Sequence, residues 1–198
     1  MDFKKNNFKA ISKFWLHFLF FSIFAFSFII FYQDTPQSNQ KTKGSYSTIE
    51  QIKIFKDSTL IIPKINVSAP IIWQVNGANK QEYFKALEGG VAHLKGTALP
   101  GQKSNLVIFG HSNFDKEAKG NYKKIFAHLN KLKEKDEITI TFGGIIFKYE
   151  TQFIRIVEPT DLWVIQPTPE ESLTLLTCWP PGSIEHRLIV RAKRKTNF

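Results

Sequence analysis

The sequence predicts an all-β domain, a β-barrel, attached to an N-terminal membrane anchor. Three observations lead to this prediction. Short apolar and β-branched segments recur between turn residues, only two stretches have helical character, and one uncharged aromatic-rich run near the N-terminus is long enough to cross a bilayer. Many short strands with few helices favour a barrel over alternating β-α-β units.

Strand character is concentrated between residues 60 and 192. LIIPKINVSAPII, at 60–72, is apolar with prolines at its edges, and it predicts two short strands or one bent strand. EITITF and IIFKYETQFIRIV flank Gly143-Gly144, and this predicts a β-hairpin because glycine supplies the backbone conformation of a tight turn. Three further strands are expected at 105–109, 172–177 and 186–192.

Two short helices are expected among these strands. NKQEYFKALEGG, at 79–90, has helical character and closes with a pair of glycines. NYKKIFAHLNKLK, at 121–133, places apolar side chains at helical spacing. These side chains are Tyr122, Ile125, Phe126, Leu129 and Leu132.

Residues 14–32, FWLHFLFFSIFAFSFIIFY, predict a transmembrane helix. The run contains no charged side chain when His17 is neutral, and as a helix it would span roughly 28 Å, close to the hydrocarbon thickness of a bilayer. Lysines precede it, so the positive-inside rule places the N-terminus in the cytoplasm. The alternative is a cleaved signal peptide, but the apolar run exceeds a typical signal core and no small-residue cleavage site follows it.

These features divide the chain into four parts. We expect a basic cytoplasmic tail at 1–13, a transmembrane signal anchor at 14–32, a polar extracellular linker at 33–57 and a folded extracellular domain at 58–198. The predicted protein is therefore a single-pass protein of the cell membrane, with its N-terminus inside and its folded domain outside.

Composition excludes several classes of protein. The formal net charge is +10, but the lysines and arginines are spread along the chain without the aromatic-basic signature of an RNA-binding sheet, so we expect no nucleic-acid partner. A basic domain attracted to an anionic surface accounts for the charge. The chain has one cysteine, which excludes an intrachain disulfide and a cysteine-rich zinc site.

Three predicted strands begin or end on reactive side chains. His111 follows the strand at 105–109, Cys178 follows the strand at 172–177, and Arg187 begins the last strand. If the last two strands pair as antiparallel neighbours, Cys178 and Arg187 lie at the same rim of the barrel. Because side chains alternate along a strand, His186 and Arg187 then face opposite ways.

This arrangement suits nucleophilic catalysis by a thiolate. An ordinary thiol is only a few per cent ionised near neutral pH, and a nearby imidazolium or guanidinium raises that fraction. An arginine beside the nucleophile can also donate hydrogen bonds to a developing oxyanion. Taken alone, Cys178 is better explained as a small buried apolar side chain, and only its position with His111 and Arg187 at strand ends favours catalysis. A zinc site made by Cys178 with His93, His111 and His186 is a further alternative, although no pair has short metal-ligand spacing.

Together these segments resemble the sortases, the membrane-anchored cysteine transpeptidases of bacterial surfaces. IIPKINVSAPII is similar to the opening strands of that family, and GGVAHLKGTALPGQKSNLVIFGHS to its central block, which ends in the catalytic histidine. TLLTCWPPG followed by RLIVRA is similar to its Thr-Leu-x-Thr-Cys signature and downstream arginine. The resemblance extends from about Leu60 to Arg191, and it implies a closed eight-stranded barrel.

The resemblance also implies a role for each matched residue. It makes Cys178 the nucleophile and His111 the general acid and base. It assigns Arg187 to the oxyanion or to positioning the substrate. His93 and Thr177 match recurrent positions in the family, and the resemblance implies supporting roles for both.

The implied reaction has two stages. The thiolate attacks a peptide carbonyl within a C-terminal sorting motif of the Leu-Pro-x-Thr-Gly type on a secreted protein, which gives a thioacyl enzyme. An amine from a cell-wall precursor or a pilin lysine then forms the new amide. This chemistry requires no cofactor, and although some sortases use calcium, no clustered acidic loop indicates it here. Asp161, in EPTDLWVI, matches a common loop acid with a structural role.

Two other functions are consistent with parts of the sequence. An L,D-type peptidoglycan transpeptidase also uses cysteine, but its Ser-His-Gly-Cys-x-Arg motif places histidine just before the cysteine, and LLTCWP lacks it. A membrane-tethered binding module with a structural cysteine is the other alternative. It predicts that Cys178 is buried and inert, with neither histidine nor arginine beside it.

Overall fold

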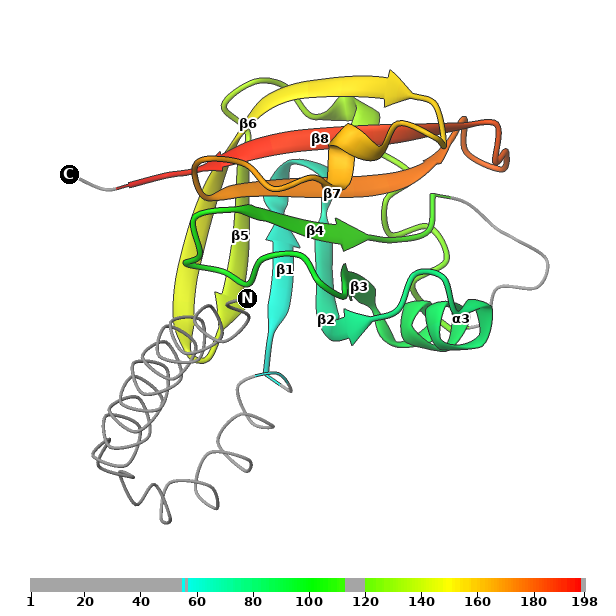
Figure 1. Cartoon of the computed structure of the whole chain (residues 1–198), viewed down its shortest axis with the longest axis horizontal. Helices are drawn as coiled ribbons and strands as arrows, with labels where there is room; N and C mark the ends of the chain where they lie inside the picture. The colour runs from blue at the N-terminus through cyan, green and yellow to red at the C-terminus, as the bar shows by residue number, and fades with distance from the viewer. Residues whose placement is uncertain (1–54, 56, 113–119, 197–198) are drawn as a thin grey trace, which may run out of the picture. The chain divides into compact units, whose positions relative to one another are not determined.

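The computed structural model describes residues 55, 57–112 and 120–196 (Figure 1). The predicted cytoplasmic tail, the predicted transmembrane run at 14–32 and nearly all of the predicted linker lie outside these residues. Among the helices that the structure does describe, none combines the length and the apolar character that crossing a bilayer would require.

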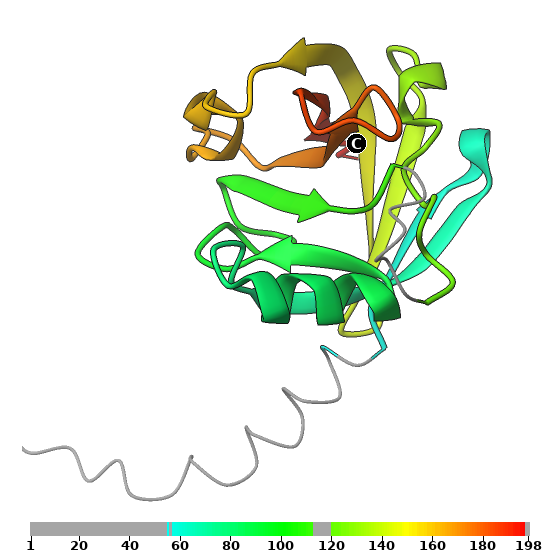
Figure 2. The same ribbon diagram turned by 90° about the vertical axis from the view of Figure 1, so that its right-hand side faces the viewer.

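Eight strands close into a barrel in the order β1-β2-β3-β4-β7-β8-β6-β5, with β5 pairing back to β1 (Figures 1 and 2). The pairs β2–β3 and β4–β7 are parallel, and the other pairs are antiparallel. This confirms the predicted all-β, closed eight-stranded barrel. The strands are β1 (Thr59–Ile62), β2 (Val67–Val75), β3 (Val91–Leu94), β4 (Asn105–Phe109), β5 (Glu137–Phe142), β6 (Ile145–Val157), β7 (Ser172–Trp179) and β8 (His186–Arg194).

The interior of the barrel is filled by alternate apolar side chains from the strands. Ile138 and Ile140 of β5 are fully buried, whereas Thr139 between them is only half-buried. Because side chains alternate across a strand, every second residue points into the barrel. This apolar interior supplies the main favourable free energy of folding, since no disulfide is available.

The hairpin between β5 and β6 forms at the predicted glycines. Gly143 and Gly144 have φ values of +59° and +78°, a conformation that side chains with a Cβ rarely adopt. Two such residues in succession are typical of a type I′ turn, whose twist matches that of the flanking strands. Phe142 pairs with Ile145 directly across the turn, so the turn sets the register between β5 and β6.

The first predicted helix is present as α3 (Lys80–Gly89). Asn79 caps it, because its side-chain oxygen accepts hydrogen bonds from the backbone N–H groups of Gln81 and Glu82, both at 3.1 Å. Leu87 is fully buried and anchors the helix on the outside of the barrel, against β2 and β3. Gly90 ends it where a Cβ would lie 2.2 Å from the carbonyl oxygen of Pro70, so only glycine fits.

The second predicted helix, at 121–133, is wrong. This segment consists of turns and a short 3-10 helix, Leu129–Lys131. The N–H of Phe126 donates to the carbonyl oxygen of His111 at 2.8 Å instead of to a preceding turn of helix. The helical spacing nevertheless identified buried residues, because Phe126 and Leu129 are at most 1% exposed. A 3-10 turn brings every third residue to the same face, which is close to the period of an α-helix, so both bury almost the same positions.

Strand β3 is the element that the sequence did not predict. It has four residues, follows the glycine pair directly and pairs with β4 through only Ala92 and His93. So short a segment carries no measurable alternation, and it is held in place by its parallel partner β2.

Candidate active site

The parallel pairing of β4 and β7 brings two strand ends to the same rim of the barrel. Phe109 lies opposite Leu176 in the last pair of that ladder. The pairing then continues beyond the strand, because the N–H of Gly110 donates to the carbonyl oxygen of Leu176 at 3.2 Å. His111 and Cys178 each follow two residues after the last pair, so the register places them at equivalent positions.

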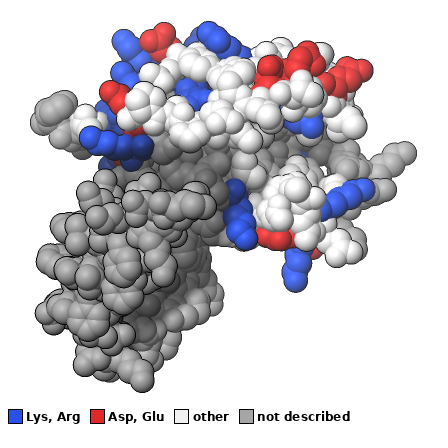
Figure 3. Space-filling model, viewed as in Figure 1, with Lys and Arg blue, Asp and Glu red and all other residues white. Residues whose placement is uncertain are grey.

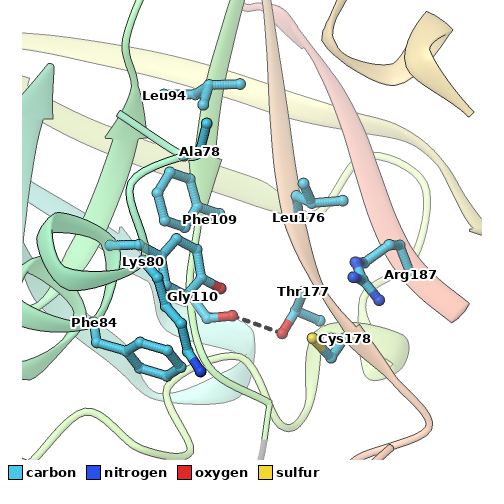
Figure 4. Close-up of a pocket in the computed structure, with 12 residues that line it drawn as sticks. Ala78, Lys80, Phe84, Leu94, Phe109, Gly110, Leu176, Thr177, Cys178 and Arg187 are labelled. Atoms are coloured by element: carbon cyan, nitrogen blue, oxygen red, sulfur yellow. Dashed lines mark hydrogen bonds between the residues drawn. The ribbon is translucent and has the colours of Figure 1, made fainter. Parts of the chain in front are cut away.

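Thr177 ties these two strand ends together. Its Oγ1 donates a hydrogen bond of 2.7 Å to the carbonyl oxygen of Gly110, and the side chain is buried (Figure 4). The residue immediately before Cys178 is thereby bonded to the residue immediately before His111. Thr177 thus lies beside the thiol, with its hydroxyl committed to the backbone.

Cys178 and Arg187 are direct partners across β7 and β8 (Figure 4). The Nη1 of Arg187 donates to the carbonyl oxygens of Ile184 and His186, both at 2.9 Å. These bonds hold the guanidinium against the loop that connects the two strands. Cys178 itself carries a free thiol, and the residue is partly exposed to solvent.

The preceding residue, His186, faces away from this site. Its Nδ1 lies 3.1 Å from Oε1 of Glu158, at the end of β6. Strand alternation requires this separation, because Arg187 occupies the face that carries Cys178. His186 is therefore not available to the thiol.

A pocket of about 390 Å³ adjoins Cys178 (Figure 4). One wall is α3, which contributes Lys80, Tyr83 and Phe84, and the others are the ends of β4 and β7 together with Arg187. Both charged side chains among the lining residues, Lys80 and Arg187, are cationic. Elsewhere on the face shown in Figure 3, acidic and basic side chains are interspersed and form no continuous basic patch.

His111 lies at the edge of this arrangement, next to the pocket residue Gly110. Its ring centroid is 6.2 Å from that of Phe84 on α3, with the two rings tilted by 30°. Hydrogen bonds hold the backbone of this predicted acid-base residue. Its carbonyl oxygen accepts from the N–H of Phe126, and the N–H of the preceding residue, Gly110, donates to Leu176 of β7. The ring is half-buried, in keeping with a side chain that can reach both protein and solvent.

Tyr83 is a pocket residue that the sequence did not single out. Its ring stacks on Phe109 with centroids 5.0 Å apart and planes within 3°. The pKa of Tyr83 is raised to about 12, mainly by burial and also by the negative charge of an ionised Cys178, while Arg187 opposes the shift. The phenol therefore stays protonated near the thiol and can donate a hydrogen bond. The contact with Phe109, which lies on strand β4, distinguishes Tyr83 from an ordinary helix aromatic.

His93 is fully buried and does not line the pocket. Its Nδ1 accepts from the N–H of Gln74 at 3.3 Å, so the ring proton lies on Nε2, which is 3.1 Å from the carbonyl oxygen of Ala98. Gln74 has φ of +60° where β2 shifts its register, and His93 thus supports an irregular backbone. Its contacts are those of a neutral, structural histidine.

This burial predicts a loss of stability in mild acid. Burial lowers the pKa of His93 to about 4 from its ordinary value near 6.5. Between these values the unfolded chain binds a proton that the folded chain does not, so stability decreases as the pH falls through this range, by about 3 kcal/mol in total. Urea unfolding at pH 7 and pH 4.5 should show a much smaller pH effect in His93→Gln. An unchanged pH effect in His93→Gln would contradict this assignment.

A buried network holds the loop between β6 and β7, and it too was not predicted. The amide of Asn105 donates to the carbonyl oxygens of Val164 and Gln166 at 2.9 and 3.1 Å. Its Oδ1 accepts from Oγ1 of Thr174 at 2.7 Å. Arg191, whose pKa is lowered by burial, adds a bond of 3.3 Å from Nη2 to Val164. Asn105 has no charge and lies inside a strand, so its sequence context gave no signal.

Asp161, the loop acid identified by the resemblance, lies near the start of the loop between β6 and β7. Its Oδ2 accepts a hydrogen bond of 2.8 Å from the N–H of Glu158. The 3-10 helix Leu162–Ile165 follows directly, so the carboxylate shapes the turn into it.

The zinc alternative is not supported by the described part of the chain. No group of three His, Cys, Asp or Glu side chains there is arranged to hold a metal ion. His93 uses both ring nitrogens inside the protein, and His186 faces away from Cys178.

Comparison with known proteins identifies the family. A model of the sortase domain matches residues 60–195. Sortase D of Bacillus subtilis is 30% identical over 171 residues, which cover 81% of this chain and 78% of that protein. Among solved structures, a Clostridium perfringens sortase D5 transpeptidase is 31% identical with a TM-score of 0.57, covering 70% of this chain and 78% of that one. A pilus-related sortase C of Group B Streptococcus is 30% identical with a TM-score of 0.60, covering 72% and 68%.

The matched region contains every residue of the pocket and the whole barrel except Thr59, the first residue of β1. An L,D-type transpeptidase and a tethered binding module are thereby set aside. The chain belongs to the sortase family, the cysteine transpeptidases that act on sorting motifs.

Proposed function

We propose that Cys178 is the nucleophile of this transpeptidase, that His111 is its general acid and base, and that Arg187 stabilises the oxyanion. The observation that carries this proposal is the register of three strands. It pairs Cys178 with Arg187 across β7 and β8 and sets His111 level with Cys178 across β4 and β7. Thr177 and His93 act through the backbone that they hold.

The first stage forms the thioacyl enzyme. The sulfur of Cys178 attacks the carbonyl carbon of the scissile peptide bond, and the electron pair of the carbonyl moves to oxygen. In this proposal, guanidinium N–H groups of Arg187 donate hydrogen bonds to that oxyanion. As the oxyanion collapses, the carbon–nitrogen bond breaks, and His111 gives a proton to the leaving amine.

The second stage releases the product. His111, now neutral, takes a proton from the incoming amine, whose nitrogen attacks the thioester carbonyl. The carbon–sulfur bond then breaks and returns the thiolate of Cys178. The protons and electrons balance within the protein and its two substrates, so the chemistry calls for no cofactor.

The proposed substrate is a secreted protein with a C-terminal sorting motif of the Leu-Pro-x-Thr-Gly type. The proposed acceptor is an amine of a cell-wall precursor or a pilin lysine. We also propose that residues 14–32 anchor the chain in the cell membrane, with 1–13 in the cytoplasm, 33–57 as an extracellular linker and 58–198 as the catalytic domain. The uncharged run and the lysines that precede it support this topology.

Mass spectrometry of the thioacyl enzyme tests this assignment. The full chain in detergent is mixed with a library of peptides that carry sorting-type motifs, with and without an amine. We expect an acyl adduct on Cys178 that disappears when the amine is added, as a new amide forms. Cys178→Ala should form no adduct. An adduct elsewhere, or none with any motif, would contradict the proposed nucleophile.

A pair of variants tests which histidine, His111 or His186, takes part in turnover. His111→Ala should lose turnover, whereas His186→Ala, which changes the histidine facing Glu158, should keep it. Full turnover in His111→Ala would remove His111 from the mechanism.

A further inference from the structure

The tip of the β5–β6 hairpin is apolar and open to solvent. Ile145 and Ile146 are 60% and 59% exposed, although they follow a tight turn directly. The stretch Thr141–Phe147 contains no charged residue. Tips of hairpins in water are usually polar, and adjacent exposed apolar side chains can mark a site of contact with a protein or a membrane.

This tip lies beside the place where the described chain begins. The ring of Phe142, at the end of β5, is 5.7 Å from the ring of Phe55, centroid to centroid. Phe55 also contacts Trp73 of β2 at 5.8 Å. Figure 1 shows the end of the hairpin and the approach to β1 at the same end of the barrel. The chain that leads to the predicted anchor therefore enters the domain next to Ile145 and Ile146.

We propose that this hairpin tip docks on the outer surface of the lipid bilayer, with Ile145 and Ile146 inserted among the lipid headgroups and upper acyl chains. The proposal rests on the proposed anchoring by residues 14–32. Insertion removes two apolar side chains from water and carries no charged group with it. Gly143 and Gly144 add no side chain to the inserted turn.

The tether makes a small apolar tip sufficient. Residues 33–54 separate the predicted anchor from Phe55, and a chain of that length reaches at most roughly 75 Å. The tip is therefore kept at high effective concentration near the bilayer, so a contact too weak to recruit a free protein still forms. Docking would give the pocket a fixed orientation relative to the bilayer.

Spin labelling of the full chain in phospholipid vesicles tests this contact. A nitroxide is attached to single cysteines introduced into the Cys178→Ala background, which has no other thiol. Ile146→Cys reports the tip. Ile184→Cys is the matched control, because Ile184 is 79% exposed in the loop between β7 and β8, far from the hairpin (Figure 1). Ile23→Cys reports the anchor independently.

For each nitroxide, the measured quantity is its accessibility to oxygen divided by its accessibility to a nickel chelate. We expect this ratio to be severalfold higher at residue 146 than at residue 184. If the ratio at residue 146 equals that at residue 184, while the ratio at residue 23 is that of a nitroxide inside the bilayer, docking is overturned and the anchor is left intact. A water-like ratio at residue 23 would overturn the anchoring itself. Exclusion of both reagents at 146 would assign the tip to a protein contact and also overturn docking.

Discussion

Replacing Arg187 with lysine is expected to lower kcat/KM of acyl transfer by about 10²- to 10³-fold, the cost of losing one oxyanion donor, while the fold stays intact. Arginine presents a planar fork, whereas lysine presents a point charge on a flexible stem. Arg187 already uses Nη1 on Ile184 and His186, and it is the direct cross-strand partner of Cys178. Lysine keeps the charge but cannot make both sets of bonds.

Steady-state kinetics with a sorting-motif peptide and an amine would measure this effect. Arg155→Lys is a matched control, because Arg155 lies on β6 and stacks on Phe153 with its guanidinium 4.7 Å from the ring centroid. We expect its activity to equal that of the wild type. Equal activity in Arg187→Lys would show that charge alone is needed, and the proposed oxyanion role would then be abandoned.

Replacing Asn105 with alanine is expected to destabilise the domain by about 3 kcal/mol, since buried polar groups left without partners cost about 1–3 kcal/mol each. Asn105 is 1% exposed and bonds Val164, Gln166 and Thr174. Alanine would leave two carbonyl oxygens of the loop and one hydroxyl with fewer partners in a site that water does not reach. The loop between β6 and β7 would lose its main attachment to the barrel.

Chemical denaturation would measure the loss. Thr174→Val removes only the bond to Oδ1 of Asn105 and should cost about 1 kcal/mol, the usual net value of one hydrogen bond. Asn130→Ala, at an exposed position, should leave the free energy of unfolding unchanged. A loss in Asn105→Ala no larger than that in Thr174→Val would show that the loop is held by other contacts.

Local signals were enough for most of the barrel. Gly143 and Gly144 specify their hairpin because the turn needs left-handed backbone at both positions. The spacing of 121–133 found the buried residues Phe126 and Leu129 but not their conformation, because the N–H of Phe126 donates to the carbonyl oxygen of His111 and makes no helical hydrogen bond. Such a bond depends on residues distant in the sequence.

The candidate site was predictable only where it follows from strand ends. The prediction that Cys178 and Arg187 share a rim needs one antiparallel pair and a short loop. Tyr83 and Asn105 could not be found in the same way. The helix that carries Tyr83 must first pack against Phe109, and Asn105 acts on carbonyl groups that are about 60 residues away.

If Cys178 and His111 act as proposed, the parallel ladder between β4 and β7 also determines when the protein becomes reactive. The hydrogen bond between Thr177 and Gly110 spans 67 residues of sequence, and no short hairpin can form such a contact early. The chain reaches His111 well before Cys178. In the proposed mechanism, thiol chemistry at Cys178 therefore waits for the last strands to close the barrel, and acyl transfer would report that folding is complete.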